Sequence, residues 1–141
     1  MSFHEPFHTG DVRVFDGLLS DDWVNHPRNP QEAAGPDGFK ATVQWFRAVF
    51  PDISFTVEDV LEDGDKVVIR SIARATHAGS EFLGLAPTGK PVEFIALEIH
   101  RFEGDRIAES WHLQDYYAML AQLGLIENVM GAAVMPYAGW A

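Results

Sequence analysis

The chain has 141 residues, of which 47% are apolar and 12% aromatic, and this composition fits one domain with a substantial core. Its formal net charge is −11, from 10 Lys and Arg against 21 Asp and Glu, and a field of that sign repels nucleic-acid backbones and anionic membrane surfaces. There is no cysteine, which excludes disulfides, thiolate nucleophiles and cysteine-bound metal.

The first ten residues are predicted to be irregular. They lack the basic region and following apolar stretch of a signal peptide, and no apolar run in the chain is long enough to span a bilayer. We therefore expect a single domain over residues 1–141, located in the cytoplasm, with neither nucleic acid nor membrane as a partner.

Two helices are predicted in the first part of the chain. Apolar side chains recur at helical spacing in residues 11–20 and again in residues 37–50, and Pro51 ends the second helix. Between them, DDWVNH at 21–26 is a short extended piece, and the Pro/Gly-rich run at 27–36 is a loop.

After Pro51 the apolar period changes from helical to alternating, which predicts four strands. The turns EDGD at 62–65 and EGDR at 103–106 each join two of them. The predicted strands cover residues 53–60, 66–77, 91–102 and 107–114.

The helical period returns at Asp115, and Gly124 is placed to end this last helix. Residues 125–141 form an apolar, Gly-rich tail with Tyr137 and Trp140. We expect that tail to cover its own domain or a neighbouring subunit.

This order of elements predicts an α+β fold with a meandering antiparallel sheet. A single long sheet with few helices must curve around them to hide its apolar face, and such a cone leaves a pocket. A four-residue turn at 103–106 pairs Phe102 with Ile107, and unbroken pairing then sets His100 opposite Glu109. On that register, one face of the sheet carries Phe94, Glu98, His100, Phe102, Trp111 and Asp115. The other face carries Ile95, Leu97, Ile99, Ser110, His112 and Gln114, and we expect it to pack a second subunit.

The histidines give no metal site. His4 and His8 are four residues apart, but Pro6 between them disfavours a helix that would bring them together. There is no phosphate-binding glycine loop and no G-x-S-x-G motif, so nucleotide cofactors and serine-hydrolase chemistry have no support.

Several stretches together resemble one family: HP at 26–27, the run from Gly35 to Val60, DGDKVVIRSIARATHAG, EFLGLAPTGKPVEF, and WHLQD followed by QLG. The ordered set is similar to the SnoaL-like polyketide cyclases of the nuclear transport factor 2-like, or ketosteroid isomerase-like, superfamily. The resemblance covers about residues 10–124 and implies a cone of curved sheet over helices, often in a dimer. This sequence departs from the family pattern in two places: its N-terminal segment is shorter, and its tail is longer and more apolar.

The resemblance also implies cofactor-independent ring closure by intramolecular aldol chemistry, with an aspartate at the end of the last strand as acid/base and a histidine on the preceding strand. Asp115 matches that aspartate and His100 matches the histidine. Asp115 has a structural interpretation too, because aspartate before a helix caps its free N–H groups and thereby favours its charged form. Trp111 and Phe102 as an apolar wall would raise its pKa again.

The remaining predicted contacts to substrate line the expected pocket. Trp111, Phe94, Phe102 and Trp45 are predicted as aromatic walls, and Glu98 as a group that orients His100. Asn25 and His26 are predicted at the pocket mouth, with turn formation ahead of Pro27 as the alternative. His112, predicted on the opposite face, is assigned to an interface or the core.

These residues lead to one main functional hypothesis and two alternatives. The main one is a cyclase or isomerase that acts on an apolar, polyketide-like carbonyl compound without cofactor or metal and forms a homodimer or higher oligomer. One alternative is a dimeric module that binds an apolar ligand without transforming it. The other is a hydrolase or dehydratase in which Asp115 activates water.

Overall fold

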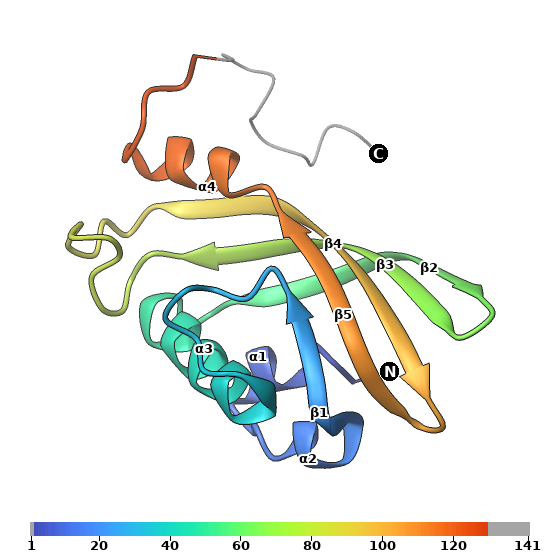
Figure 1. The fold of residues 1–141 in the computed structure, drawn as a ribbon. Coiled ribbons are helices and arrows are strands. Elements are labelled where there is room, and N and C mark those ends of the chain that lie inside the picture. The colour runs from blue at the N-terminus through green and yellow to red at the C-terminus, as the bar shows by residue number, and fades with distance from the viewer. Residues whose placement is uncertain (1, 130–141) are drawn as a thin grey trace.

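The computed structural model describes residues 2–129, so most of the predicted tail, including Tyr137 and Trp140, lies outside the described residues. Within them, one five-stranded curved sheet packs against helices, which confirms the predicted α+β class (Figure 1). The elements in chain order are α1 (Glu5–Thr9), α2 (Val14–Leu18), β1 (Leu19–His26), α3 (Gly35–Val49), β2 (Ser54–Asp63), β3 (Lys66–Thr76), β4 (Pro91–Glu103), β5 (Arg106–Gln114) and α4 (Tyr116–Leu123).

The N-terminal residues are more ordered than the sequence predicts. Pro6 lies in the first turn of α1, where its missing N–H would have had no helical partner, so it fits the helix instead of breaking it. Gly10, at φ 81°, ends α1 and donates its N–H to the carbonyl of Pro6 at 2.9 Å. The helix predicted over 11–20 forms only as α2, because Leu19 already begins β1.

The sheet has the strand order β1-β5-β4-β3-β2. The predicted antiparallel pairing of β2 to β5 is confirmed. The prediction did not include β1, which contains the extended piece at 21–26 and pairs in parallel with β5 at the edge of the sheet. Figure 1 shows α1, α2 and α3 on the concave side of this sheet and α4 above β4. The concave side therefore holds the core, with Phe15, Val43, Phe50 and Phe94 almost fully buried.

The register between β4 and β5 differs from the prediction at one point. Phe102 pairs with Ile107 as expected, but Arg101 pairs with Glu109, so Ala108 is an extra residue on β5. This β-bulge reverses the face of every later residue on β5, because side chains alternate along a strand. The predicted placement of Trp111 and Asp115 on the face of His100 is therefore wrong, and Ser110, His112 and Gln114 take that place.

Candidate functional site

A cavity of about 80 Å³ lies between α3 and the concave face of the sheet. One side of it is aromatic, and the other carries polar side chains from β1, β4 and β5, from the loop before α3, and from α3 and α4. The aromatic side is made of Phe3, Phe7, Phe39, Phe46, Phe55 and Phe94, joined by Ile53. The polar side includes Asn25, Glu32, Thr42, Glu98, His100, Ser110, His112, Gln114 and Tyr116.

A hydrogen-bonded row of buried side chains forms the centre of the polar side. Trp23 Nε1–H donates to Ser110 Oγ at 3.0 Å, and Ser110 Oγ lies 2.7 Å from His100 Nδ1. His100 Nε2 lies 3.0 Å from Glu98 Oε2. One neutral tautomer satisfies every group, with Nε2–H donating to the carboxylate and Nδ1 accepting from the serine hydroxyl.

Glu98 is the buried carboxylate of the site, only 4% exposed. Its second oxygen, Oε1, accepts a hydrogen bond from His4 Nε2 at 2.8 Å, so each oxygen has an imidazole partner. Burial by itself raises the pKa of Glu98, but the hydrogen bonds from His100 and His4 outweigh it and hold the pKa at about 2. Glu98 is therefore ionised at neutral pH and serves as an acceptor.

His112 faces the cavity from β5 beside the Glu98 network, since Glu98 and His112 are paired across the strands. Its Nε2 lies 2.8 Å from the carbonyl oxygen of Pro27, which can only accept, so Nε2 carries a hydrogen. Its Nδ1 lies 2.8 Å from Gln114 Oε1, which is also an acceptor. Both ring nitrogens of His112 therefore lie at hydrogen-bond distance from an acceptor oxygen, and in neutral His112 the Nδ1 lone pair is free only when the Gln114 side chain turns away.

The cavity is bordered by a second polar group around Glu32. Thr42 Oγ1 donates to this carboxylate at 2.6 Å and Asn25 Nδ2 at 3.4 Å. Tyr116 lines the cavity close by, and although 40% of the residue is exposed, burial raises the pKa of its phenol to about 12, with the Glu32 charge adding to the rise. The phenol therefore keeps its proton at neutral pH and can donate it to an oxygen of a ligand.

Asp115 occupies the helix-capping position that the sequence also allowed. Its Oδ1 accepts the N–H of Ala118 at 3.1 Å, and its own N–H bonds to the carbonyl of Ile95 at 2.9 Å. It is not among the residues that line the cavity. The structure therefore brings together His100, Glu98, Phe94 and Asn25 of the predicted site, and places Asp115 at its edge.

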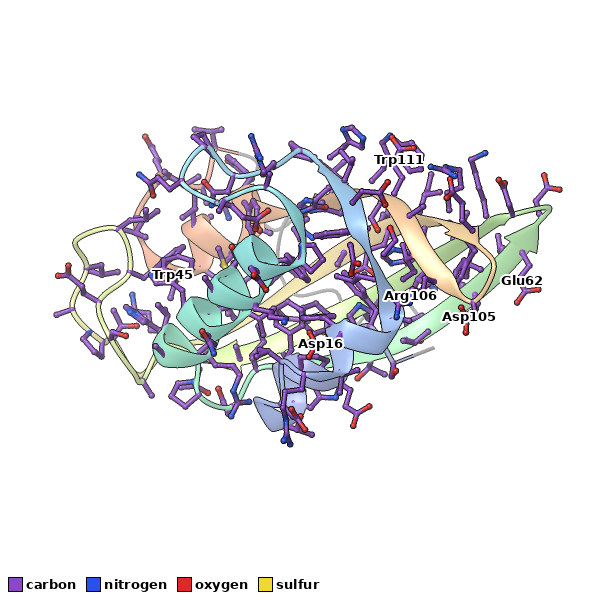
Figure 2. All side chains as sticks on the ribbon, turned by 60° about the horizontal axis from the view of Figure 1, so that its bottom comes forward. Asp16, Trp45, Glu62, Asp105, Arg106 and Trp111 are labelled. Atoms are coloured by element: carbon purple, nitrogen blue, oxygen red, sulfur yellow. The ribbon has the colours of Figure 1, made fainter. Side chains whose placement is uncertain are left out.

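Four other predicted pocket residues lie away from the cavity lining. Trp111 and His26 stack on each other with ring centroids 5.5 Å apart, and His26 Nε2 also bonds Glu109 at 2.7 Å. Trp45 is 43% exposed on α3, and Figure 2 shows both Trp45 and Trp111 at the periphery of the molecule. Phe102 is half-buried next to the β4–β5 turn and packs against the core.

Sequence reasoning missed the cavity residues Ser110, His112 and Gln114 because it assumed unbroken pairing after the turn. Their own spacing, every second residue on one strand, did show that they share a face. His4 was missed for another reason: no sequence signal ties residue 4 to residue 98. In the part of the chain that the structure describes, no group of three or more histidine or acidic residues could hold a metal ion.

The comparisons with known proteins agree with this architecture. The family model described as SnoaL-like polyketide cyclase matches residues 1–123. Among solved structures, IdmH of Streptomyces antibioticus, a proposed polyketide cyclase, is 36% identical with a TM-score of 0.75, covering 86% of this chain and 92% of its own. A proposed polyketide cyclase of Bacillus cereus is 30% identical with a TM-score of 0.77, covering 88% and 76%.

TsrD of Streptomyces laurentii is 25% identical to this chain with a TM-score of 0.79, and the match covers 88% of this chain and 90% of TsrD. No protein with a curated description matches the chain. Between residues 2 and 129, none of the helices has the length and apolar character needed to cross a membrane.

Proposed function

The chain belongs to the SnoaL-like polyketide cyclase family, and we propose that it closes a ring in a polyketide-like carbonyl compound by acid/base catalysis without a cofactor. The observation that carries this proposal is the cavity itself, in which His112, His100 and Glu98 face an aromatic wall. Proton transfer at carbon needs a base within reach of the substrate and an environment that excludes water. The residues that line the cavity supply both.

We assign the proton transfer to His112. Once the half-buried Gln114 side chain turns away, the freed Nδ1 removes a proton from the carbon next to a carbonyl, so that the C–H bond breaks and an enolate forms. The Pro27 carbonyl holds Nε2–H and stabilises the resulting imidazolium, as an orienting acceptor does for other catalytic histidines. Because its pKa is about 12, the Tyr116 phenol donates a hydrogen bond to the enolate oxygen.

Ring closure then needs no further group. The enolate carbon attacks a second carbonyl of the same substrate, a C–C bond forms, and the new alkoxide takes the proton back from His112. Because the cavity holds both carbonyls close together, the reacting groups are positioned in advance and need no chance encounter. His100 has both nitrogens engaged by buried side chains, Glu98 and Ser110, whereas the Gln114 partner of His112 is only half-buried, so we assign His100 as a positioning residue of the polar side.

Asp115, the base expected from the family resemblance, is the competing assignment, and two variants separate it from His112. The substrate probe is a short linear diketone whose enolate can reach its second carbonyl, and the readout is cyclised product by NMR. We expect His112→Asn to lower turnover about 100-fold or more, and Asp115→Asn to stay within about threefold of wild type. The reverse result would make Asp115 the base, and binding of the probe without any cyclised product would favour a module that only binds its ligand.

One observation favours a second candidate, hydrolysis in the same cavity. Ser110, His100 and Glu98 follow one another through hydrogen bonds in the order of a nucleophile, a base and a carboxylate. Ser110 Oγ would attack an ester carbonyl and give its proton to His100, which would pass it to the leaving alcohol. An activated ester tests this candidate. Covalent acylation of Ser110 that is absent in Ser110→Ala would support hydrolysis. Product formation without an acyl-enzyme would contradict Ser110 as the nucleophile.

A further inference from the structure

Phe3 lies inside the concave side of the molecule, where it lines the cavity. It is 5% exposed, its ring centroid is 4.5 Å from that of His100, and it stacks on Phe39 at 5.4 Å. These contacts are those that a planar ring of a ligand would make with the aromatic wall and the polar side at once.

His4 follows and makes the matching polar contact. Its Nε2 lies 2.8 Å from Glu98 Oε1, and its ring stacks almost parallel on Phe55, with centroids 4.7 Å apart and planes 7° from parallel. Without His4, this oxygen of a buried, ionised carboxylate would lose its donor, which is costly in free energy. Any group that replaces His4 must therefore donate a hydrogen bond.

The space left beside these two side chains is too small for the proposed substrate. The cavity measures about 80 Å³, whereas a void that holds one benzene ring is about 150 Å³ and typical ligand pockets are about 300–1,000 Å³. A compound with two carbonyls and a closing ring fits only if something moves. Phe3, Phe7 and His4 are the residues whose withdrawal would enlarge the cavity without opening the sheet.

Few polar contacts hold this segment from outside the cavity. Arg47 Nη1 donates to the carbonyls of Phe7 at 2.7 Å and of His8 at 3.1 Å. The N–H of Phe55 donates to His8 Nε2 at 2.8 Å. Helix α1 itself is a single short turn without a side-chain cap, so its own hydrogen bonds add little stability. The segment is held mainly by the burial of Phe3, His4 and Phe7, which are the contacts that a ligand would replace.

We infer that residues 2–9 form a plug that occupies the ligand's place, with Phe3 in the position of a planar ring and His4 in the position of its hydrogen-bond donor to Glu98. A ligand enters by displacing the plug, and the class that fits is a planar ring with a neutral hydroxyl at its edge. An anionic group there is disfavoured by the Glu98 carboxylate. The inference rests on the proposed function in taking this cavity as the substrate site.

The test uses β-naphthol as a probe and the Arg47→Met variant, which removes the two bonds to the segment without changing any residue that lines the cavity. Because plug and probe compete for one place, loosening the plug raises the affinity of the probe. We expect about tenfold tighter binding to Arg47→Met by calorimetry. Arg70→Met, an exposed arginine on β3, is the matched control and should bind as wild type does.

Amide hydrogen exchange of the wild-type protein gives the decisive readout. The N–H groups of Phe7 and Gly10 are bonded to His4 and Pro6 within the segment, at 3.0 and 2.9 Å. Saturation with β-naphthol should speed their exchange about tenfold or more, and the methyl ether of the probe, which cannot donate, should bind more weakly. Unchanged or increased protection of these amides in the complex, equal affinities of Arg47→Met and wild type, or no binding at all would each overturn the inference.

These readouts are binding and exchange, so they do not depend on turnover. A cyclase with a fixed N-terminal segment would form product while the Phe7 and Gly10 amides stay protected. If β-naphthol displaces the segment but the protein cyclises no diketone, the plug is supported and the proposed reaction is contradicted.

Discussion

The carboxylate of Glu98 and the imidazole of His100 form a buried pair, with Oε2 and Nε2 3.0 Å apart on the concave face of the sheet. The pair has almost no contact with solvent, so neither partner can be removed without leaving a buried polar group. Together with His4, it fixes the charge state of the polar side of the cavity. This arrangement has consequences for stability that can be measured directly.

The first prediction concerns the stability of the protein at acidic pH. The pKa of Glu98 is about 2 in the folded protein against 4.5 for the free side chain, so its contribution to stability is fully present above about pH 4.5 and is lost as pH falls towards 2. We expect about 2 kcal/mol of this contribution to be gone at about pH 3. Urea unfolding at about pH 6 and about pH 3 should show a smaller loss for Glu98→Gln than for wild type.

The groups that face Glu98 are His4 and His100, and they remain in both proteins compared. Glu62→Gln, on the exposed end of β2, controls for the general effect of removing a negative charge. If Glu98→Gln and Glu62→Gln lose stability in parallel with wild type over this pH range, the hydrogen bonds from the two histidines do not hold the Glu98 pKa down.

A second prediction concerns the cap of α4. Asp115→Ala removes the acceptor for the N–H of Ala118 and should lower the free energy of unfolding by about 1 kcal/mol, whereas Asp115→Asn, also a good capping residue, should cost less. Thermal or urea unfolding measures both. Equal losses for alanine and asparagine would mean that the charge of Asp115, and not its capping oxygen, is what the fold uses.

Much of the fold could be predicted because its signals are local. The change from helical to alternating apolar period at Pro51, the turns at 62–65 and 103–106, and the end of α4 at Gly124 all appear in the structure. The alternation on β4 likewise put Phe94, Glu98 and His100 on one face, and all three line the cavity.

The site was harder to predict because two of its determinants are not local. A single unpaired residue, Ala108, exchanges the faces of Trp111 and His112, and no turn or glycine marks it in the sequence. The contact of His4 with Glu98 joins residues 94 positions apart and depends on where α1 lies in the finished fold. Local periodicity contains neither piece of information.

A third prediction concerns the convex face of the sheet. Leu97 is 44% exposed, Ile99 37% and Leu113 70%, and they lie on neighbouring strands, with Leu97 paired to Leu113. We propose that a second copy of the chain covers this apolar patch, since exposed patches of this kind mark interaction sites. Leu113→Asp should then shift sedimentation from dimer to monomer, and Leu83→Asp, 67% exposed in the loop between β3 and β4, should not. A wild-type monomer at micromolar concentration would contradict it.

The last prediction compares two buried serines of the sheet. Ser110 Oγ accepts from Trp23 and bonds His100, so Ser110→Ala leaves two buried partners unsatisfied. Ser71 Oγ is equally buried but has no hydrogen-bond partner within residues 2–129, so Ser71→Ala removes only an unsatisfied group. We expect Ser110→Ala to lower the free energy of unfolding by about 2–4 kcal/mol and Ser71→Ala to leave it unchanged or raise it. Because both variants delete one oxygen from a strand interior, equal losses in urea unfolding would show that packing, and not the row from Trp23 to Glu98, stabilises this part of the cavity.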